Sequence, residues 1–274
     1  MGVRVRDLLL SEFESLRYEP IQKRIRALVG DRTVVDTTRA MLVWEPKRVV
    51  PSYAVPAEDV DAEIAGAADA APPAGEIRAP QLAGRPVFDP SIPFAVHTSE
   101  GEPVLIRSEA GHDATAFRMA DPAVAGYILL DFDSFDAWYE EDERNVAHPK
   151  DPFHRIDVVP SSRKVRVESG GEVLAESANA LFLFETQLPI RYYLPPEDVR
   201  TDLLRPSDTK TFCAYKGQAS YWSFGDEDDL VWSYPEPLRD AAEVTDRMAF
   251  FNERVDIVVD GERHERPVTP WSRR

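Results

Sequence analysis

The chain has 274 residues, an apolar fraction of 43% and a net charge of −17. Its length and apolar fraction predict one large or two small domains with a substantial hydrophobic core. Both halves of the chain are acidic, which argues against nucleic acids and anionic membrane surfaces as partners, because neither half offers a surface that neutralises phosphates.

The N-terminal segment 7–18 has the spacing of an amphipathic helix, with Leu9, Phe13 and Leu16 on one face and Pro20 after them. We also expect short helices at 197–204 and 238–246. The remaining elements are expected to be strands.

The first strands are predicted from alternation and turn residues. A hairpin is expected within 22–35, with its turn at Gly30-Asp31. The segment 51–56 is bounded by prolines, so we expect it at the edge of a sheet. Residues 61–88 are rich in Ala, Pro, Gly and Glu and contain few large apolar side chains. They predict a mobile insertion within the first domain.

The second half of the chain repeats the first. Residues 26–45 align with 166–185 without a gap, so that Glu45 meets Glu185. A repeat of this length indicates two copies of one domain rather than a solenoid, and we expect the two copies to pair within the molecule. The predicted order is an N-terminal helix (1–19), a first copy (20–147), a linker (148–155), a second copy (156–266) and a tail (267–274).

The copies differ in the segment around Lys216. Aligning Gly217 with Gly101 places Glu100 opposite Lys216, and puts aliphatic residues opposite Tyr221 and Trp222. On this alignment the first copy is degenerate, and any site lies in the second copy.

Six motifs of the second copy resemble the domain of unknown function 427 family, and the whole chain resembles its tandem-domain members. They are Tyr192–Arg200, Leu203–Asp208, Cys213–Gly217, Ala219–Trp222, Trp232–Pro237 and Phe250–Asp256. The chain departs from the family at Ala214, where proline is usual. The resemblance implies a mainly β fold of two tandem homologous β-tent-like domains with short helices. It implies no established activity, although the family is sometimes labelled nucleotidyltransferase-like.

The segment 211–222 holds the single cysteine, a Lys-Gly pair and several large aromatic residues. Gly217 suits a tight turn with positive φ, and Lys216 could point an ammonium into a pocket with aromatic walls. We therefore expect a site for a small anionic or carbonyl-bearing ligand, formed by Glu185, Tyr193, Arg200, Tyr215, Lys216, Gly217, Tyr221 and Trp222.

Two alternatives remain open. The protein could be a non-enzymatic scaffold that binds another protein, with Lys216 solvated at a turn and Cys213 an inert buried thiol. It could also be an enzyme that uses Lys216 with Cys213 as a nucleophile. A buried, partnered Lys216 with a depressed pKa would favour the pocket, and an exposed apolar patch would favour the scaffold.

Cofactor and metal sites are not predicted. The chain has no glycine-rich phosphate loop, its histidines are scattered, and one cysteine cannot form an intrachain disulfide or a multi-cysteine zinc site. No apolar run is long enough to span a bilayer, and the charged N-terminus is not typical of a signal peptide. We therefore expect a cytoplasmic protein.

Overall fold

The computed structural model describes residues 2–67, 79–82, 84–109 and 112–272. It is mainly β and divides into two compact units, Met1–Pro80 with Pro86–Asp151, and Gln81–Arg85 with Pro152–Arg274. Within the described part of the chain, no helix has the length and apolar character needed to cross a membrane.

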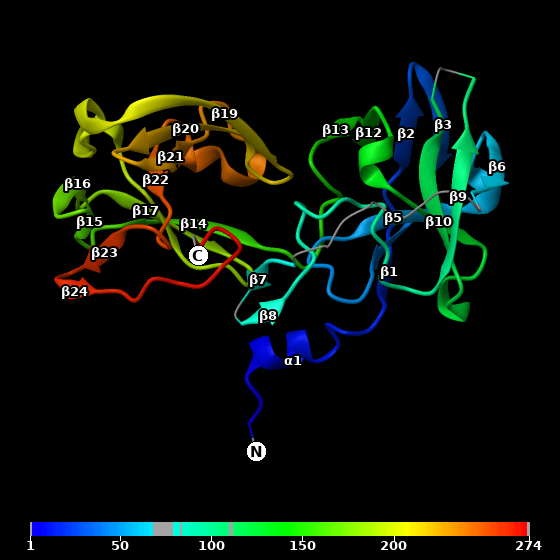
Figure 1. Ribbon diagram of the computed structural model, residues 1–274, viewed down its shortest axis with the longest axis horizontal. Helices are drawn as coiled ribbons and strands as arrows, with labels where there is room; N and C mark the ends of the chain where they lie inside the picture. Colours follow the sequence, from blue (N-terminus) through cyan, green and yellow to red (C-terminus); the bar gives the residue numbers. More distant parts are fainter. Residues whose placement is uncertain (1, 68–78, 83, 110–111, 273–274) are drawn as a thin grey trace. The chain divides into compact units, whose positions relative to one another are not determined.

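The first unit contains a seven-stranded and a four-stranded sheet (Figure 1). The order in the larger sheet is β1 (Arg17–Pro20), β4 (Met41–Trp44), β5 (Ser52–Pro56), β11 (Tyr127–Leu130), β10 (Ala114–Met119), β9 (Gly101–Arg107) and β6 (Glu63–Gly66). The smaller sheet has the order β13 (Glu143–Asn145), β12 (Ala137–Glu140), β2 (Ile25–Val29) and β3 (Arg32–Thr37).

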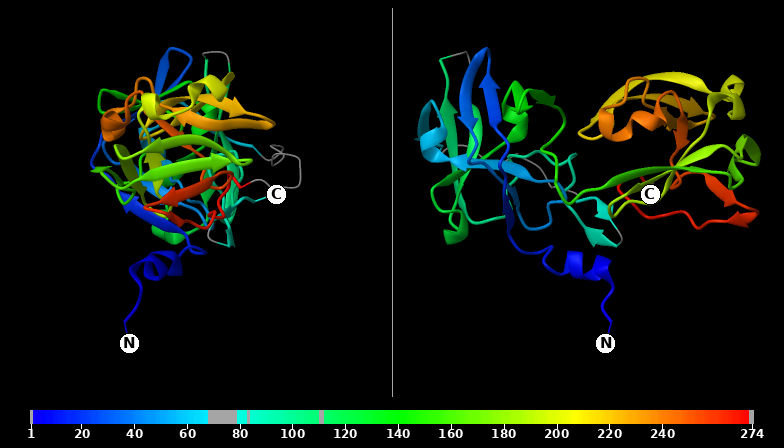
Figure 2. Two further views of the ribbon diagram at one scale, coloured as in Figure 1. Left: turned by 90° about the vertical axis from the view of Figure 1, so that its left-hand side faces the viewer. Right: turned by 180° about the vertical axis from the view of Figure 1, so that it is seen from behind.

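Residues 156–263 of the second unit form three sheets, and Figure 2 shows the chain from two further sides. The first has the order β14 (Ile156–Ser161), β17 (Ala180–Glu185) and β18 (Arg191–Tyr193). The second has the order β19 (Arg205–Cys213), β20 (Gly217–Phe224), β21 (Glu227–Ser233) and β22 (Met248–Phe250). The third has the order β16 (Glu172–Ser177), β15 (Val165–Ser169), β23 (Asp256–Val259) and β24 (Glu262–Arg263).

The two units repeat the same strand order. Strands β14-β17-β18 correspond to β1-β4-β5, and β22-β21-β20-β19 correspond to β11-β10-β9-β6. In the second unit these two sheets are joined by a bridge in which Leu194 and Met248 each donate a backbone hydrogen bond to the other. The predicted repeat is therefore present as two units of one topology, consistent with tandem domains.

The predicted hairpin is confirmed, and it recurs in the second unit. Strands β2 and β3 turn at Gly30-Asp31, and the pairing register shifts between Ala27 and Leu28. In the second unit the register of β15 and β16 shifts between Val167 and Glu168, at the same position of the repeat. Such a bulge increases the local twist of the strand pair.

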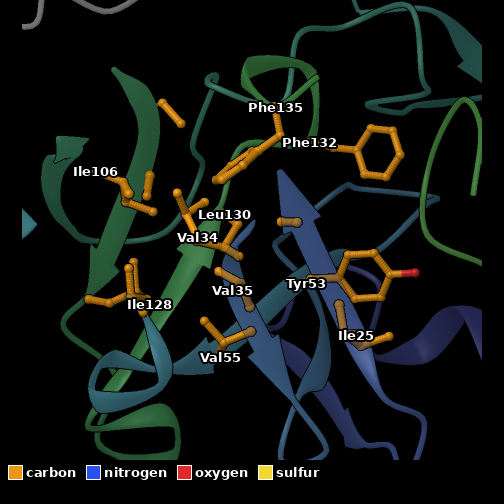
Figure 3. Packing of buried hydrophobic residues seen from close by; sticks show 14 of the residues in the cluster. Ile25, Val34, Val35, Tyr53, Val55, Ile106, Ile128, Leu130, Phe132 and Phe135 are labelled. Atoms are coloured by element: carbon orange, nitrogen blue, oxygen red, sulfur yellow. The ribbon is translucent and has the colours of Figure 1, made fainter. Parts of the chain in front are cut away.

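Each unit buries apolar side chains on both faces of its main sheet. This is the seven-stranded sheet in the first unit, and the two sheets joined by the Leu194–Met248 bridge in the second. In the first unit, Ile25, Val35, Tyr53, Ile128 and Leu130 belong to the cluster between the two sheets (Figure 3). A second cluster on the other face includes Met41, Val43 and Phe117. In the second unit the corresponding clusters include Tyr192 on one face and Tyr193 on the other. The alternation of side chains along each strand explains how adjacent residues reach different cores.

The predicted helices are shorter than expected. The N-terminal helix α1 spans Val5–Ser11, and the prediction of helix up to residue 18 is wrong, because Arg17 and Tyr18 pair with β4. The helices expected at 197–204 and 238–246 are short 3₁₀ helices: η4 (Pro196–Asp198), η5 (Thr201–Leu203) and η6 (Arg239–Val244). Comparable 3₁₀ helices in the first unit are η1 (Ala57–Asp59), η2 (Pro122–Val124) and η3 (Phe132–Ser134).

The prediction of an edge position for 51–56 is also wrong. Strand β5 lies inside the sheet, between β4 and β11. Pro51 precedes the strand and Pro56 ends it, opposite Tyr127. The missing proline N–H groups therefore fall at the ends of the ladder rather than within it.

The predicted insertion 61–88 is partly ordered into strands. Its start contributes β6, which pairs with β9, and its end contains β7 (Gln81–Leu82) and β8 (Arg85–Pro86). The interpretation as a mobile insertion is thus too broad at both ends. Residues 68–78 and 83 lie outside the described residues.

Candidate functional site

A tight turn between β19 and β20 presents Lys216. Cys213 ends β19 opposite Gly217, which starts β20. Gly217 has φ +90°, and a Cβ there would lie 3.3 Å from the backbone oxygen of Glu236. The turn therefore requires glycine, as the sequence predicted.

Lys216 forms a buried ion pair with Glu185. Its Nζ donates to Glu185 Oε1 at 2.8 Å and to Oε2 at 2.7 Å. Glu185 is the last residue of β17, and only 10% of the Lys216 side chain and 7% of the Glu185 side chain are exposed. Lys216 is thus buried and partnered, not a solvated turn lysine.

Both groups of this pair are charged at neutral pH. Burial alone would lower the pKa of Lys216, but neighbouring Cys213 and Glu185 raise that pKa above its usual value. Burial opposes ionisation of Glu185, yet Lys216 and His154 lower the pKa of Glu185 to about 2. The depressed lysine pKa that would favour the pocket is therefore not found, and the pair is a fixed ammonium and carboxylate.

His154 completes the cluster, although the sequence predicts it only as part of the linker 148–155. Its Nε2 lies 3.0 Å from Glu185 Oε1, and its ring stacks on Tyr215 at a centroid distance of 4.6 Å. His154 and Glu185 are 31 positions apart, and no local motif connects them. Only the pairing of β14 with β17 brings them together, because it joins Ile156 to Glu185.

Tyr193 lies in the apolar cluster on this face of the sheet. It is fully buried, and its hydroxyl accepts a hydrogen bond of 3.0 Å from Trp232 Nε1. Burial raises its pKa to about 12, although Lys216 opposes the shift. The phenol is therefore neutral at physiological pH and interacts electrostatically with the Lys216 ammonium.

Two of the predicted site residues, Arg200 and Trp222, lie apart from this cluster. Arg200 is exposed and binds Asp202 through two hydrogen bonds of 2.8 Å. Tyr221 packs against the same apolar cluster as Tyr193, and its hydroxyl lies 2.6 Å from Thr211 Oγ1. Trp222 packs against the core between the sheets, on the opposite face from Tyr193. The structure thus brings together Glu185, Tyr193, Tyr215, Lys216, Gly217 and Tyr221.

A comparable buried cluster exists in the first unit, although the sequence predicts a degenerate copy there. Glu45 Oε2 lies 3.1 Å from His97 Nδ1, and His97 Nε2 lies 3.3 Å from Asp131 Oδ1. The His97 ring stacks on Phe117 at 3.9 Å. The two carboxylates outweigh burial and raise the pKa of His97 to about 9.

Strand register shows which residues of the two units are equivalent. Phe117 of β10 pairs with Leu129 of β11, and Trp232 of β21 pairs with Ala249 of β22. These four residues occupy matching positions of the repeat. Phe117 is therefore the equivalent of Trp232.

The same register corrects the predicted alignment around Lys216. On the neighbouring strand at the other side, Phe117 pairs with Pro103, and Trp232 pairs with Tyr221. Pro103 is thus equivalent to Tyr221, and Thr98 to Lys216, so the alignment of the two glycines is wrong by two residues. The backbone N–H of Thr98 donates to Glu45 Oε1 at 3.0 Å, where the second unit uses an ammonium.

Among the described residues, no group of three or more His, Cys, Asp or Glu side chains is placed to hold a metal ion. The arrangement instead offers hydrogen-bond donors. An ammonium has three donor protons, and within the described part of the chain Glu185 supplies the acceptors that Lys216 Nζ binds.

Comparison with known protein families assigns the chain to a family by its sequence. A family described as a domain of unknown function, DUF427, matches residues 17–71 and 157–261, more than half of the chain. The two matched segments fall in the two units. No curated protein matches the chain.

Proposed function

Because the chain belongs to the DUF427 family, whose description names no activity, we propose from the site itself that the second unit binds a small anionic or carbonyl-bearing ligand at Lys216. The observation that carries this proposal is the buried Lys216–Glu185 pair, with Nζ bound at 2.8 and 2.7 Å. Two donor protons are engaged by the carboxylate, and among the residues that the structure describes Lys216 Nζ has no other acceptor, so the third proton can bind a ligand oxygen.

The surroundings of Lys216 suit a small ligand. The aromatic ring of Tyr215 and the imidazole of His154 stack beside the ion pair, which gives an apolar wall next to a charged donor. His154 is the most accessible member of the cluster, with 20% of its side chain exposed. Entry of a ligand past this imidazole would place an anionic or carbonyl oxygen near the ammonium.

An enzyme that uses Cys213 as the nucleophile beside Lys216 stays the second alternative, whereas a nucleophilic role of the Lys216 amine is disfavoured. An amine must be deprotonated to attack a carbonyl carbon, and the raised pKa of Lys216 opposes this. The ammonium is better suited to hydrogen bonding with a carbonyl than to forming a covalent bond with it.

A thermal-shift screen of small carboxylates, phosphates and oxo acids tests the proposal. A ligand at 100 times its Kd stabilises the folded state by about 2.7 kcal/mol. The double variant Glu185→Gln/Lys216→Met removes both charges while it keeps the side-chain volumes similar. A matched control is Lys210→Met, which removes an exposed lysine bonded to Ser220.

We expect a hit to raise the Tm of wild type and of the Lys210 variant, but not that of the double variant. Equal shifts in all three proteins, or no shift with any compound, would contradict the proposed site.

The scaffold alternative is favoured by a separate observation. Val159 of β14 and Phe184 of β17 lie on adjacent strands, and each is 41% exposed. Exposed apolar side chains of this kind occur in protein-binding surfaces. A Val159→Ser/Phe184→Ser variant that loses a protein partner, while the ligand screen stays negative, would support this function instead.

A further inference from the structure

A cavity lies in the second unit, on the face of β18 opposite Tyr193. Its volume is about 130 Å³, and its lining includes Ile190, Tyr192, Asn252, Ile257, His264 and Glu265. Tyr192, Asn252 and Ile257 are buried, whereas Glu265 is exposed. The cavity therefore has a buried floor and an acidic mouth, and it does not depend on the function proposed for Lys216.

The first unit contains the equivalent of this region. Tyr53 corresponds to Tyr192 in the repeat, and the Tyr53 hydroxyl accepts a hydrogen bond of 2.8 Å from Asn145 Nδ2. The Tyr192 hydroxyl lies 3.4 Å from His264 Nδ1. Since Asn145 and His264 occupy matching positions on β13 and after β24, the two contacts are counterparts.

Two aromatic side chains fill this region in the first unit. Trp138 pairs with Ala27, and Ile257 pairs with Val167, at matching positions of the repeated hairpin. Trp138 is therefore the equivalent of Ile257. Its ring stacks on Phe132 at 5.1 Å, with 7° between the planes.

The second unit has smaller or polar residues at both positions. Phe132 follows the end of β11 by two residues, as Asn252 follows the end of β22. Replacing the Trp-Phe pair by Ile and Asn removes most of the volume of two rings. The cavity is thus the space that the sister unit fills with its core.

Asn252, which lines the cavity, has an unsatisfied hydrogen-bond acceptor. Asn252 Nδ2 donates to the Ile190 carbonyl oxygen at 2.8 Å. Asn252 Oδ1 is buried and has no hydrogen-bond partner among the described residues. Buried polar atoms are normally paired, because leaving one unpaired is costly, so a donor is needed at this position.

The charge at the mouth selects the class of donor. Glu265 is an exposed carboxylate among the lining residues, and the cavity walls include Ile190 and Ile257. We propose that this cavity binds a compact alkyl cation with N–H donors, of the alkylguanidinium or alkylammonium class. A cavity of this size is comparable to one that holds benzene, which limits the buried part to about six non-hydrogen atoms.

The binding geometry follows from the lining. A ligand N–H would donate to Asn252 Oδ1, and the alkyl part would contact the isoleucines. The carboxylate of Glu265 would balance the positive charge. A guanidinium is only weakly hydrated and can stack on an aromatic ring, which suits the ring of Tyr192.

The test uses the full chain with ethylguanidinium and propylammonium as cationic probes, propionamide as a neutral probe and propionate as an anionic one. Binding is followed by NMR from the backbone amide shifts of Ile190, Asn252 and His264. We expect saturable shifts with a cationic probe, and none with propionate.

Three variants decide whether the cavity is the site. Asn252→Phe with Ile257→Trp transfers the filling residues of the first unit and should abolish the shifts. Glu265→Gln changes only an exposed side chain and should weaken binding about threefold, as expected for a partly solvated ion pair. Glu197→Gln removes an exposed acid elsewhere on the same unit and should leave the affinity unchanged.

The proposal is overturned if propionate shifts the same amides as strongly as the cations, or if no probe gives saturable shifts. It is also overturned if the cations bind equally to wild type and to a folded filled variant, since such binding would reflect the net charge of −17. Should the filled variant not fold, an unchanged affinity in Glu265→Gln would overturn it.

Discussion

The Lys216 ammonium binds both carboxylate oxygens of Glu185, at 2.8 and 2.7 Å. The two residues come from different sheets of the second unit, β17 and the turn before β20. A buried pair of this kind makes each charge depend on the other, because neither can return to water while the protein is folded.

Removing one partner should therefore cost more than removing both. We expect Lys216→Met alone to lower the free energy of unfolding by about 3–5 kcal/mol, because it leaves the Glu185 carboxylate buried without its ammonium. The double variant Glu185→Gln/Lys216→Met should recover most of this loss. Urea denaturation at pH 7 measures both. A double variant as unstable as the single one would show that the pair itself stabilises the fold.

The low pKa of Glu185, about 2 against a usual 4.5, predicts acid sensitivity. A carboxyl whose pKa is depressed in the folded state stabilises the protein above pH 4.5, and this contribution is lost as the pH falls towards 2. Relative to the double variant, wild type should lose on the order of 3 kcal/mol over that range. Urea denaturation of wild type and of the double variant at several pH values measures this loss. If the stabilities of the two proteins fall in parallel with pH, the low pKa assigned to Glu185 is contradicted.

The ion pairs of His97 predict the opposite pH dependence of stability in the first unit. Its pKa is raised from 6.5 to about 9 by Asp131 and Glu45. A raised pKa stabilises the folded protein fully below pH 6.5, and this contribution is lost as the pH rises through 9. We expect the imidazole signals of His97 to titrate near pH 9 by NMR, and His97→Gln to lose the stability change between pH 6.5 and 9. His112→Gln, at an exposed position, is the control, and titration of His97 near 6.5 would refute the prediction.

Arg191 should not tolerate lysine. Its guanidinium binds both oxygens of Glu253 at 2.8 and 2.7 Å, and it lies over the rings of Trp232, Phe251 and Trp271 at 5.4–5.8 Å. Lysine keeps the charge but loses the paired hydrogen bonds and the planar stacking, so Arg191→Lys should cost about 2–3 kcal/mol in unfolding free energy.

A matched control is available for this prediction. Arg200 makes a similar two-bond contact with Asp202, but on the surface. Arg200→Lys should cost less than about 1 kcal/mol, since exposed ion pairs contribute little. Urea denaturation measures both variants. Equal losses of unfolding free energy would show that burial does not decide how much the lysine substitution destabilises the protein.

Much of the fold follows from local patterns. The alternation of apolar residues predicts strands, and the match between Arg26–Glu45 and Arg166–Glu185 predicts the repeated hairpin, including the equivalence of Glu45 and Glu185. These predictions hold because strand period and turn chemistry involve residues close together in the chain. The length of α1 was overestimated because Arg17 and Tyr18 pair with a distant strand, and tertiary pairing overrides helical spacing.

The candidate site was only partly predictable. Lys216, Gly217 and Tyr215 were found because they are adjacent in the chain, and Glu185 because it lies in the repeat. His154 was missed, and Arg200 and Trp222 were grouped with residues that they do not approach. Sequence spacing does not report which strand edge or sheet face a distant residue reaches.

The sequence by itself determined the mainly β class, the tandem repeat and the segment that carries Lys216, because each rests on short-range patterns or on self-similarity. Only the tertiary structure decided the ion pair with Glu185, the two-residue correction to the alignment of the copies around Lys216 and the cavity beside Asn252. These depend on strand pairing and on the volume of side chains that meet from separate sheets, and neither is encoded in any one stretch of the chain.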